Sequence, residues 1–338
     1  MIKIRGLALL LCLGLASAQA ALNTDGLPAN PAAIIALDFQ AFRATKIGQA
    51  AVKFAGTKKN NAAMSALLRE KLGLDLDKDI HDVLIGIYSG PDGKVSEKNA
   101  SGVVLLRGKF DPARLNATAE KTGVLQKQIG KYQAWEANDF AEKIFAQKPK
   151  GERNEAYLIA LSTDTLVLLS ADLLEKALPS LEQKTPCPQA LPAAIRAKFD
   201  TAASGWFFIW ADVTQKQGSA NEATELTGVI SENTADLQLA VLLKFVTKEN
   251  AEKNRKLLKG LQAIAAITLT QDDGKSAEEK EMIQTLGEII QKLIINGQDD
   301  TLTLNLDYPA DKLAQALIAA FEKAQRDAVS PAGLSAGK

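Results

Sequence analysis

The sequence is poor in the residues that most catalytic and metal sites require. It contains one histidine, His81, in 338 residues, whereas nucleophile–histidine triads need a histidine base and most zinc sites need several imidazole or thiolate ligands. The glycine-rich loops that bind phosphates or dinucleotides are also missing. We therefore expect no cofactor and no enzyme activity. His81 stands beside Asp82 at the edge of an expected strand, and we interpret it as a surface residue.

Cysteine is almost as scarce. The two cysteines are Cys12, which lies in a strongly apolar N-terminal segment, and Cys187, which lies between two prolines. If the N-terminal segment is removed, one cysteine remains and no internal disulfide can form. No histidine lies near Cys187 in the sequence, so we interpret this thiol as incidental.

The first twenty residues have the pattern of a signal peptide. Lys3 and Arg5 form a basic region, residues 7–15 are apolar, and Ala18-Gln19-Ala20 is a small-x-small cleavage site. We expect cleavage after Ala20 and a periplasmic or secreted protein. The residues before Cys12 are not those of a lipidation site, and no later stretch has the apolar length of a membrane-spanning helix.

The charge balance argues against nucleic acid as a partner. Lys3 and Arg5 account for two of the 40 basic side chains, so the rest of the chain carries 38 basic against 40 acidic side chains. Binding to phosphates requires a concentrated basic surface. We interpret the short lysine runs as solvated helix faces.

A strand that leads directly into a helix occurs four times. The clearest copy is residues 102–123, in which Asp111 and Pro112 are a helix N-cap and a first helical residue. The other copies begin near residues 33, 237 and 301, and in each the apolar face of the strand ends in an aromatic residue. We expect these rings to close the ends of a core between sheet and helices. The four aromatic residues are Phe39, Phe110, Phe245 and Tyr308.

These units predict an α+β fold with two similar halves, each a mainly antiparallel sheet with helices packed on one face. The expected divisions are a signal peptide (1–20), a first domain (21–184), a linker or connecting helix (185–200), a second domain (201–328) and a disordered tail (329–338). We interpret the repeated pattern as a duplication. The sequence does not decide whether the halves are separate domains or share one sheet.

Two stretches of the second half carry more specific predictions. Residues 205–213 are apolar on both faces, which is typical of a strand inside a sheet. Trp206, Phe208 and Trp210 alternate along this strand, where core packing is favoured over stacking on a ligand. A later helix is expected to bury Met282, Leu286, Ile289 and Leu293.

An acidic segment before the strand at residues 83–88 is the weak candidate for a metal site. Asp75, Asp77 and Asp79 alternate there, but the glycine and the final glutamate of a calcium-binding loop are missing. We favour aspartates that cap a tight turn.

Four segments together resemble a group of secreted bacterial proteins without a known activity. They share a Leu-Pro-Ala opening at residues 27–29, a Gly-Leu-Asp turn at residues 73–75 and a Phe-Asp-Pro helix start at residues 110–112. The matching segments are LPANPAAIIALDFQAFRATKIGQ, LGLDLDKDIHDVLIG, GVVLLRGKFDPARL and TLVLLSADLLEKAL. The resemblance covers about the first 180 residues and implies a secreted α+β domain.

The leading hypothesis is an exported, non-enzymatic binding or scaffolding protein of unknown ligand. One alternative is a carrier that holds a lipid or other amphiphile in a groove between sheet and helices. Another is a carboxylate-based hydrolase, which two facing carboxylates in a cleft would favour. The expected partner is therefore an unknown protein or an amphiphile.

Overall fold

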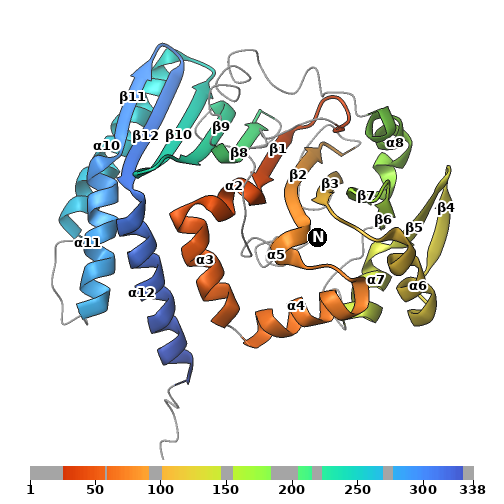
Figure 1. Cartoon of the computed structure of the whole chain (residues 1–338). Helices are drawn as coiled ribbons and strands as arrows, with labels where there is room; N and C mark the ends of the chain where they lie inside the picture. Colours follow the sequence, from red (N-terminus) through yellow and green to blue (C-terminus); the bar gives the residue numbers. More distant parts are fainter. Residues whose placement is uncertain are drawn as a thin grey trace, which may run out of the picture.

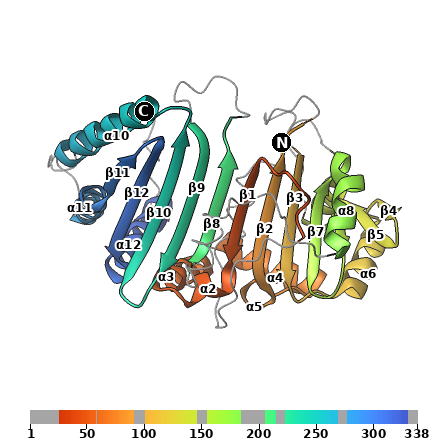
Figure 2. The same ribbon diagram turned by 90° about the horizontal axis from the view of Figure 1, so that it is seen from above.

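The computed structural model describes residues 26–57, 59–90, 101–145, 155–183, 205–214, 223–268 and 277–329. The described strands form one twelve-stranded antiparallel sheet in the order β11-β12-β10-β9-β8-β1-β2-β3-β7-β6-β5-β4 (Figures 1 and 2). The predicted α+β class is confirmed. The signal peptide, the connection at residues 185–200, Cys187 and residues 330–338 lie outside the described residues.

The first half contributes seven strands to this sheet. They are β1 (Ala33–Asp38), β2 (Ile80–Tyr88), β3 (Ser101–Gly108), β4 (Gln126–Ile129), β5 (Tyr132–Glu136), β6 (Ala156–Ala160) and β7 (Thr165–Ser170). Its helices are α2 (Phe39–Ala44), α3 (Lys46–Thr57), α4 (Lys59–Leu72), α5 (Leu76–Asp79), α6 (Pro112–Thr122), α7 (Ala137–Phe145), the short η1 (Ala171–Leu173) and α8 (Leu174–Gln183).

The second half contributes the remaining five strands. They are β8 (Gly205–Asp212), β9 (Ala223–Glu232), β10 (Asp236–Phe245), β11 (Ile294–Gln298) and β12 (Thr301–Pro309). Its helices are α10 (Lys248–Thr268), α11 (Ala277–Lys292) and α12 (Ala310–Val329).

The two halves share the sheet through their first strands. β1 pairs with β8 from Ala33↔Ala211 to Leu37↔Phe207, so hydrogen bonds join the halves without a break. β8 lies between β1 and β9, as the apolar run at residues 205–213 predicted. Outward from this pair the order is β1-β2-β3-β7-β6-β5-β4 on one side and β8-β9-β10-β12-β11 on the other. β5 and β4 have no counterpart in the second half, and the duplication stays a prediction.

The two faces of the sheet are covered differently. One face carries a core formed with α2 and α4–α7. Over the strands of the second half, α3 of the first half packs on this same face together with α10 and α12. On the opposite face, Leu27 and α8 cover the first half, where they pack on Leu105 and Leu169. The second half differs, because its β10 exposes Gln238, Ala240 and Lys244 on that face.

The strand-to-helix corners follow the predictions. Phe39, Phe110, Phe245 and Tyr308 are all buried, with at most 9% of each residue exposed. The Asp111 Oδ1 atom accepts a hydrogen bond from the Arg114 amide at 3.0 Å, which caps the N-terminus of α6. These rings close the core.

Three expectations need correction. β11 follows α11 at once and was not predicted, because the sequence offers no turn residue between helix and strand. Leu286, expected on the buried side of α11, is 45% exposed. Trp206 does not lie on the same face of the sheet as Phe208 and Trp210. A β-bulge between Gly205 and Phe207 turns its side chain to the other face, where it contacts Phe42 of α2.

Across the described residues, no helix is both long and apolar enough to cross a membrane.

Candidate functional site

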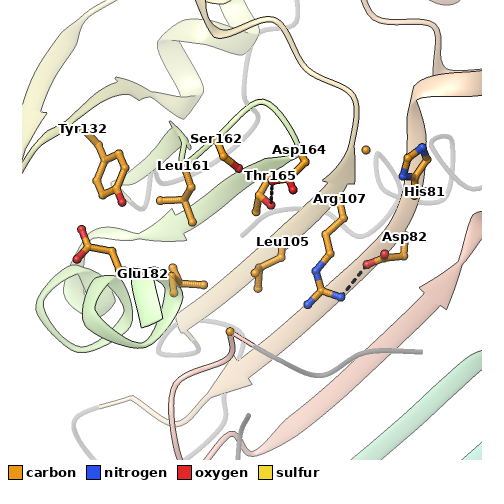
Figure 3. A pocket seen from close by; sticks show the side chains of 13 residues that line it. His81, Asp82, Leu105, Arg107, Tyr132, Leu161, Ser162, Asp164, Thr165 and Glu182 are labelled. Atoms are coloured by element: carbon orange, nitrogen blue, oxygen red, sulfur yellow. Dashed lines mark hydrogen bonds and ion pairs between the residues drawn. The ribbon is translucent and has the colours of Figure 1, made fainter. Parts of the chain in front are cut away.

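A pocket of about 500 Å³ opens in the first half, on the face of the sheet that carries α8. Its lining comes from β2, β3, the turn between β6 and β7, the start of β5 and the end of α8. Figure 3 shows Arg107, Asp82 and His81 on one side, and Leu161, Tyr132 and the Glu182 carboxylate on the other. The pocket therefore combines charged and apolar side chains.

A β-bulge in β2 brings two consecutive residues into this pocket. The register passes from Ile80↔Gly108 to Asp82↔Arg107, so His81 has no partner on β3. Consecutive side chains of a regular strand point to opposite faces, and a bulge changes the direction of a side chain. His81 and Asp82 consequently both line the pocket. The surface interpretation of His81 is incomplete, because the residue is half-buried at this site.

Asp82 and Arg107 form the charged pair of the site. The Arg107 Nη1 atom lies 3.2 Å from the Asp82 Oδ1 atom, and 19% and 23% of the two side chains are exposed. Burial raises the pKa of the Asp82 carboxyl, and the positive charges of Arg107 and His81 partly oppose that shift. Arg107 presents a planar guanidinium, the side chain best suited to bind a phosphate or carboxylate.

Gly108 fixes the wall beside Arg107. A Cβ atom at this position would lie 1.9 Å from the Asp79 carbonyl oxygen, so no other residue fits without a shift of the backbone. The Gly108 amide donates to the Asp164 carbonyl oxygen at 2.9 Å, and the Lys109 amide donates to the Asp79 carbonyl oxygen at 2.7 Å. These contacts hold β3 against α5 and against the β6–β7 turn.

The β6–β7 turn adds a second charged group. The Asp164 Oδ1 atom accepts hydrogen bonds from the hydroxyl groups of Ser162 and Thr165, the latter at 2.9 Å. Glu182 of α8 lies 4.0 Å from the exposed Lys131. Asp82 is paired with Arg107, and Asp164 and Glu182 are further carboxylates of the lining. The pocket thus offers charges of both signs.

Three leucines and a tyrosine contribute the apolar surface of the pocket. Leu105 and Leu181 are buried, and Leu161 is half-buried. The Tyr132 ring lies below the Lys131 ammonium, which is 5.1 Å from its centroid. An apolar lining with a few polar groups is typical of sites that bind small organic ligands.

A second carboxylate lies next to Asp82 but not in the pocket. Asp38 of β1 is the register partner of Asp82, and burial raises the Asp38 pKa to about 6, with a further contribution from the Asp82 charge. The Asp38 Oδ1 atom caps α2 by accepting from the Ala41 amide at 2.8 Å. Asp38 is 2% exposed and does not line the pocket. The two carboxylates are close, yet only Asp82 can meet a ligand.

The weak metal candidates hold a turn together. The Asp79 Oδ2 atom accepts from the Asp75 amide at 2.7 Å. The Asp75 Oδ1 atom lies 3.0 Å from the Arg69 Nη2 atom. The side chain of Asp77 lies outside what the structure describes, and the described residues contain no group of three His, Cys, Asp or Glu that could hold a metal ion.

Sequence reasoning missed the site. Arg107, Asp164, Tyr132 and Glu182 lie on four different elements, so no spacing in the sequence connects them. The single available signal was a charged residue at position 107, inside an otherwise apolar strand.

The chain matches no model of a known protein family and no curated protein sequence. Among solved structures it is similar to crystal forms I, III and IV of a protein called TP0453. The matches have 9%, 7% and 9% sequence identity and TM-scores of 0.40, 0.45 and 0.45. Each covers 89% of this chain and 98% or more of the TP0453 chain.

Proposed function

We propose that this chain is an exported, non-enzymatic binding protein for a small amphiphile, which it holds in the pocket beside α8. The observation that supports the proposal is that one pocket is lined both by the Arg107 guanidinium and by the apolar side chains of Leu105, Leu161 and Leu181. An amphiphile is the kind of ligand that satisfies both at once. Export is supported by the sequence pattern of residues 1–20.

The charged residues of the pocket indicate which kind of polar head group the amphiphile carries. A purely anionic head would meet the carboxylates of Asp82, Asp164 and Glu182, and like charges in a partly buried site repel. A purely cationic head would meet Arg107. A zwitterionic head can place its anionic group at Arg107 and its cationic group at Asp164. We therefore expect a zwitterionic amphiphile to bind best.

The same geometry supports binding over hydrolysis. A carboxylate-based hydrolase needs two carboxyl groups that both reach the substrate. Asp82 lines the pocket, whereas its neighbour Asp38 is enclosed and caps α2. His81 lines the pocket without a hydrogen-bonded nucleophile among the contacts of the described residues. This arrangement suits recognition of a ligand.

The test is a titration with decylphosphocholine at submicellar concentration, followed by calorimetry. A Ser162→Trp variant places a large side chain at the pocket wall from an exposed turn position. Thr163→Trp is the matched control, because Thr163 is exposed in the same turn and does not line the pocket. Equal unfolding free energies of the two variants exclude an effect of misfolding.

The proposal predicts that Ser162→Trp weakens binding at least tenfold and that Thr163→Trp binds like the natural protein. Decanoate and decyltrimethylammonium, which carry one sign of charge each, should bind more weakly than decylphosphocholine. If none of the three amphiphiles binds, or if Ser162→Trp leaves binding unchanged, the pocket is not an amphiphile site.

A further inference from the structure

Two carboxylates and a guanidinium form one row across three neighbouring strands beside the pocket. Asp38 of β1 is the register partner of Asp82 of β2, and Asp82 is the register partner of Arg107 of β3. Register partners in a sheet have their side chains on the same face, with Cα atoms about 5 Å apart. The three charged groups therefore follow one another on the face that carries the pocket.

Two members of this row line the pocket and the third is enclosed. Asp82 and Arg107 line the pocket as an ion pair (Figure 3). Asp38 is 2% exposed and does not line it. The Asp38 Oδ1 atom caps α2, whereas its Oδ2 atom is buried without a hydrogen-bond partner in the described part of the chain. Burial without a partner penalises the ionised carboxylate, so this oxygen favours a bound proton.

The groups that face Asp38 leave its negative charge only partly compensated. Burial is the main cause that raises the pKa of Asp38 to about 6, and the Asp82 charge adds to it, while two backbone amides and Arg43 of α2 oppose it. Burial also raises the pKa of Asp82, against the positive charges of Arg107 and His81. Two interacting carboxylates titrate as a pair. The pair therefore takes up a proton as the pH falls through about 6.

An anionic group bound at Arg107 is repelled by the charge of this pair. Two strand spacings, about 10 Å, separate Asp38 from Arg107. A unit charge at this distance in a partly buried site changes the affinity for an anion by about tenfold. Coupling between two sites is reciprocal, so an anion bound at Arg107 also makes the pair bind its proton more tightly.

We propose that the Asp38–Asp82 pair selects the charge of the ligand: with both carboxylates ionised the pocket disfavours an anionic head group, and with one proton on the pair it accepts such a group at Arg107. The proton comes from solvent and is held by one of the two carboxyl groups. Asp38 acts on the ligand through Asp82 and Arg107, without contact. The inference rests on the proposed function, because it assigns a ligand selectivity to the same pocket.

The experiment is calorimetric titration with decanesulfonate at submicellar concentration, at pH 5.5, 6.5 and 8. A sulfonate stays ionised over this range, so a change in affinity comes from the protein. Asp38→Asn removes the enclosed charge and keeps an oxygen that can cap α2. Asp111→Asn is the matched control, because Asp111 caps α6 by the same contact, is exposed and does not line the pocket. His81→Gln is included because histidines also take up a proton in this range.

We expect the natural protein and Asp111→Asn to bind decanesulfonate at least fivefold more tightly at pH 5.5 than at pH 8. Asp38→Asn should bind it about tenfold more tightly than the natural protein at pH 8 and should lose most of the pH dependence. His81→Gln should keep a dependence of at least fivefold.

Proton uptake by the natural protein gives a measurement that needs no variant. Titrations at pH 6.5 in phosphate and in imidazole buffer, which differ in ionisation enthalpy, measure the protons taken up on binding. A tenfold coupling corresponds to a pKa change of about one unit. Starting from a pKa of about 6 for Asp38, the uptake should be about half a proton per decanesulfonate, and Asp38→Asn should lack this contribution.

Two results would overturn the inference while the proposed function stands. The first is equal affinity for decanesulfonate at pH 5.5 and pH 8 in a natural protein that binds decylphosphocholine. The second is an Asp38→Asn variant with the same pH profile as the natural protein, since the titrating group would then be another residue. If decylphosphocholine binds at none of the three pH values, the proposed function is wrong and the inference falls with it.

Discussion

Replacing Asp38 by asparagine should stabilise the protein at neutral pH and not at acidic pH. Burial raises the pKa of this carboxyl from 3.8 to about 6, and its Oδ2 atom is buried without a hydrogen-bond partner in the described part of the chain. Asparagine keeps an oxygen that can accept from the Ala41 amide, as Asp38 Oδ1 does, but it carries no charge. The substitution removes the cost of burying a carboxylate.

The magnitude follows from the pKa difference. A pKa raised on folding means that the folded state binds the proton more tightly, so the natural protein loses stability as the pH rises. The loss begins near the unfolded pKa of 3.8 and is complete above about 6. Since one pKa unit corresponds to about 1.4 kcal/mol, the full loss is about 3 kcal/mol. Asp38→Asn should therefore match the natural protein near pH 3.5 and exceed it by about 3 kcal/mol at pH 8.

Urea unfolding followed by tryptophan fluorescence, at several pH values, measures this difference. Asp111→Asn is the matched control, because Asp111 caps α6 by the same contact but is exposed. It should change the unfolding free energy by less than about 0.5 kcal/mol, since Asp and Asn are equivalent N-caps. If Asp38→Asn is less stable than the natural protein at pH 8, or if the difference does not vary with pH, other interactions of the Asp38 carboxylate offset the cost of burying its charge.

Three further substitutions test contacts within the first half, each by urea unfolding at pH 7. Gly108→Ala should cost about 3 kcal/mol, because the new Cβ would lie 1.9 Å from the Asp79 carbonyl oxygen; a cost below 1 kcal/mol would show that β3 can shift freely. Arg43→Met should also cost about 3 kcal/mol, because the buried Arg43 donates to the carbonyl oxygens of Leu76 and Ile80 at 3.0 and 2.7 Å; an unchanged midpoint would show that these oxygens find other donors. Asp111→Ala should cost about 1 kcal/mol through the lost N-cap of α6, and a neutral effect would mean that the cap does not limit stability.

Local patterns in the sequence predicted the elements well. The alternation at residues 301–308 predicted β12, and the Asp-Pro pair at residues 111–112 predicted the start of α6. The apolar run at residues 205–213 predicted an inner strand. These features depend on side-chain period and on capping, which act over a few residues.

The site could not be predicted because it depends on contacts between distant segments. The ion pair of Asp82 and Arg107 joins β2 to β3, and the bulge that turns His81 toward the pocket appears only when the register of these strands is known. Bulges shift register by one residue, so alternation alone cannot locate them. The same limit explains Trp206, which a bulge separates from Phe208 and Trp210.

Local patterns in the sequence also do not determine the order of the strands in the sheet. Four similar strand-to-helix units indicate repetition, but the joining of the halves depends on the pairing of β1 with β8, which are about 170 residues apart. Leu286 shows a related difficulty. Its place in a helical period predicted burial, yet the neighbouring helices leave this side of α11 exposed.

The most direct test of the central claim is the position of bound decylphosphocholine, observed as nuclear Overhauser effects between its decyl chain and leucine methyl groups. We expect contacts to the methyl groups of Leu105, Leu161 and Leu181, and their loss in Ser162→Trp. Contacts to the exposed Leu257 and Leu261 of α10 instead, with none to the three pocket leucines, would contradict this expectation.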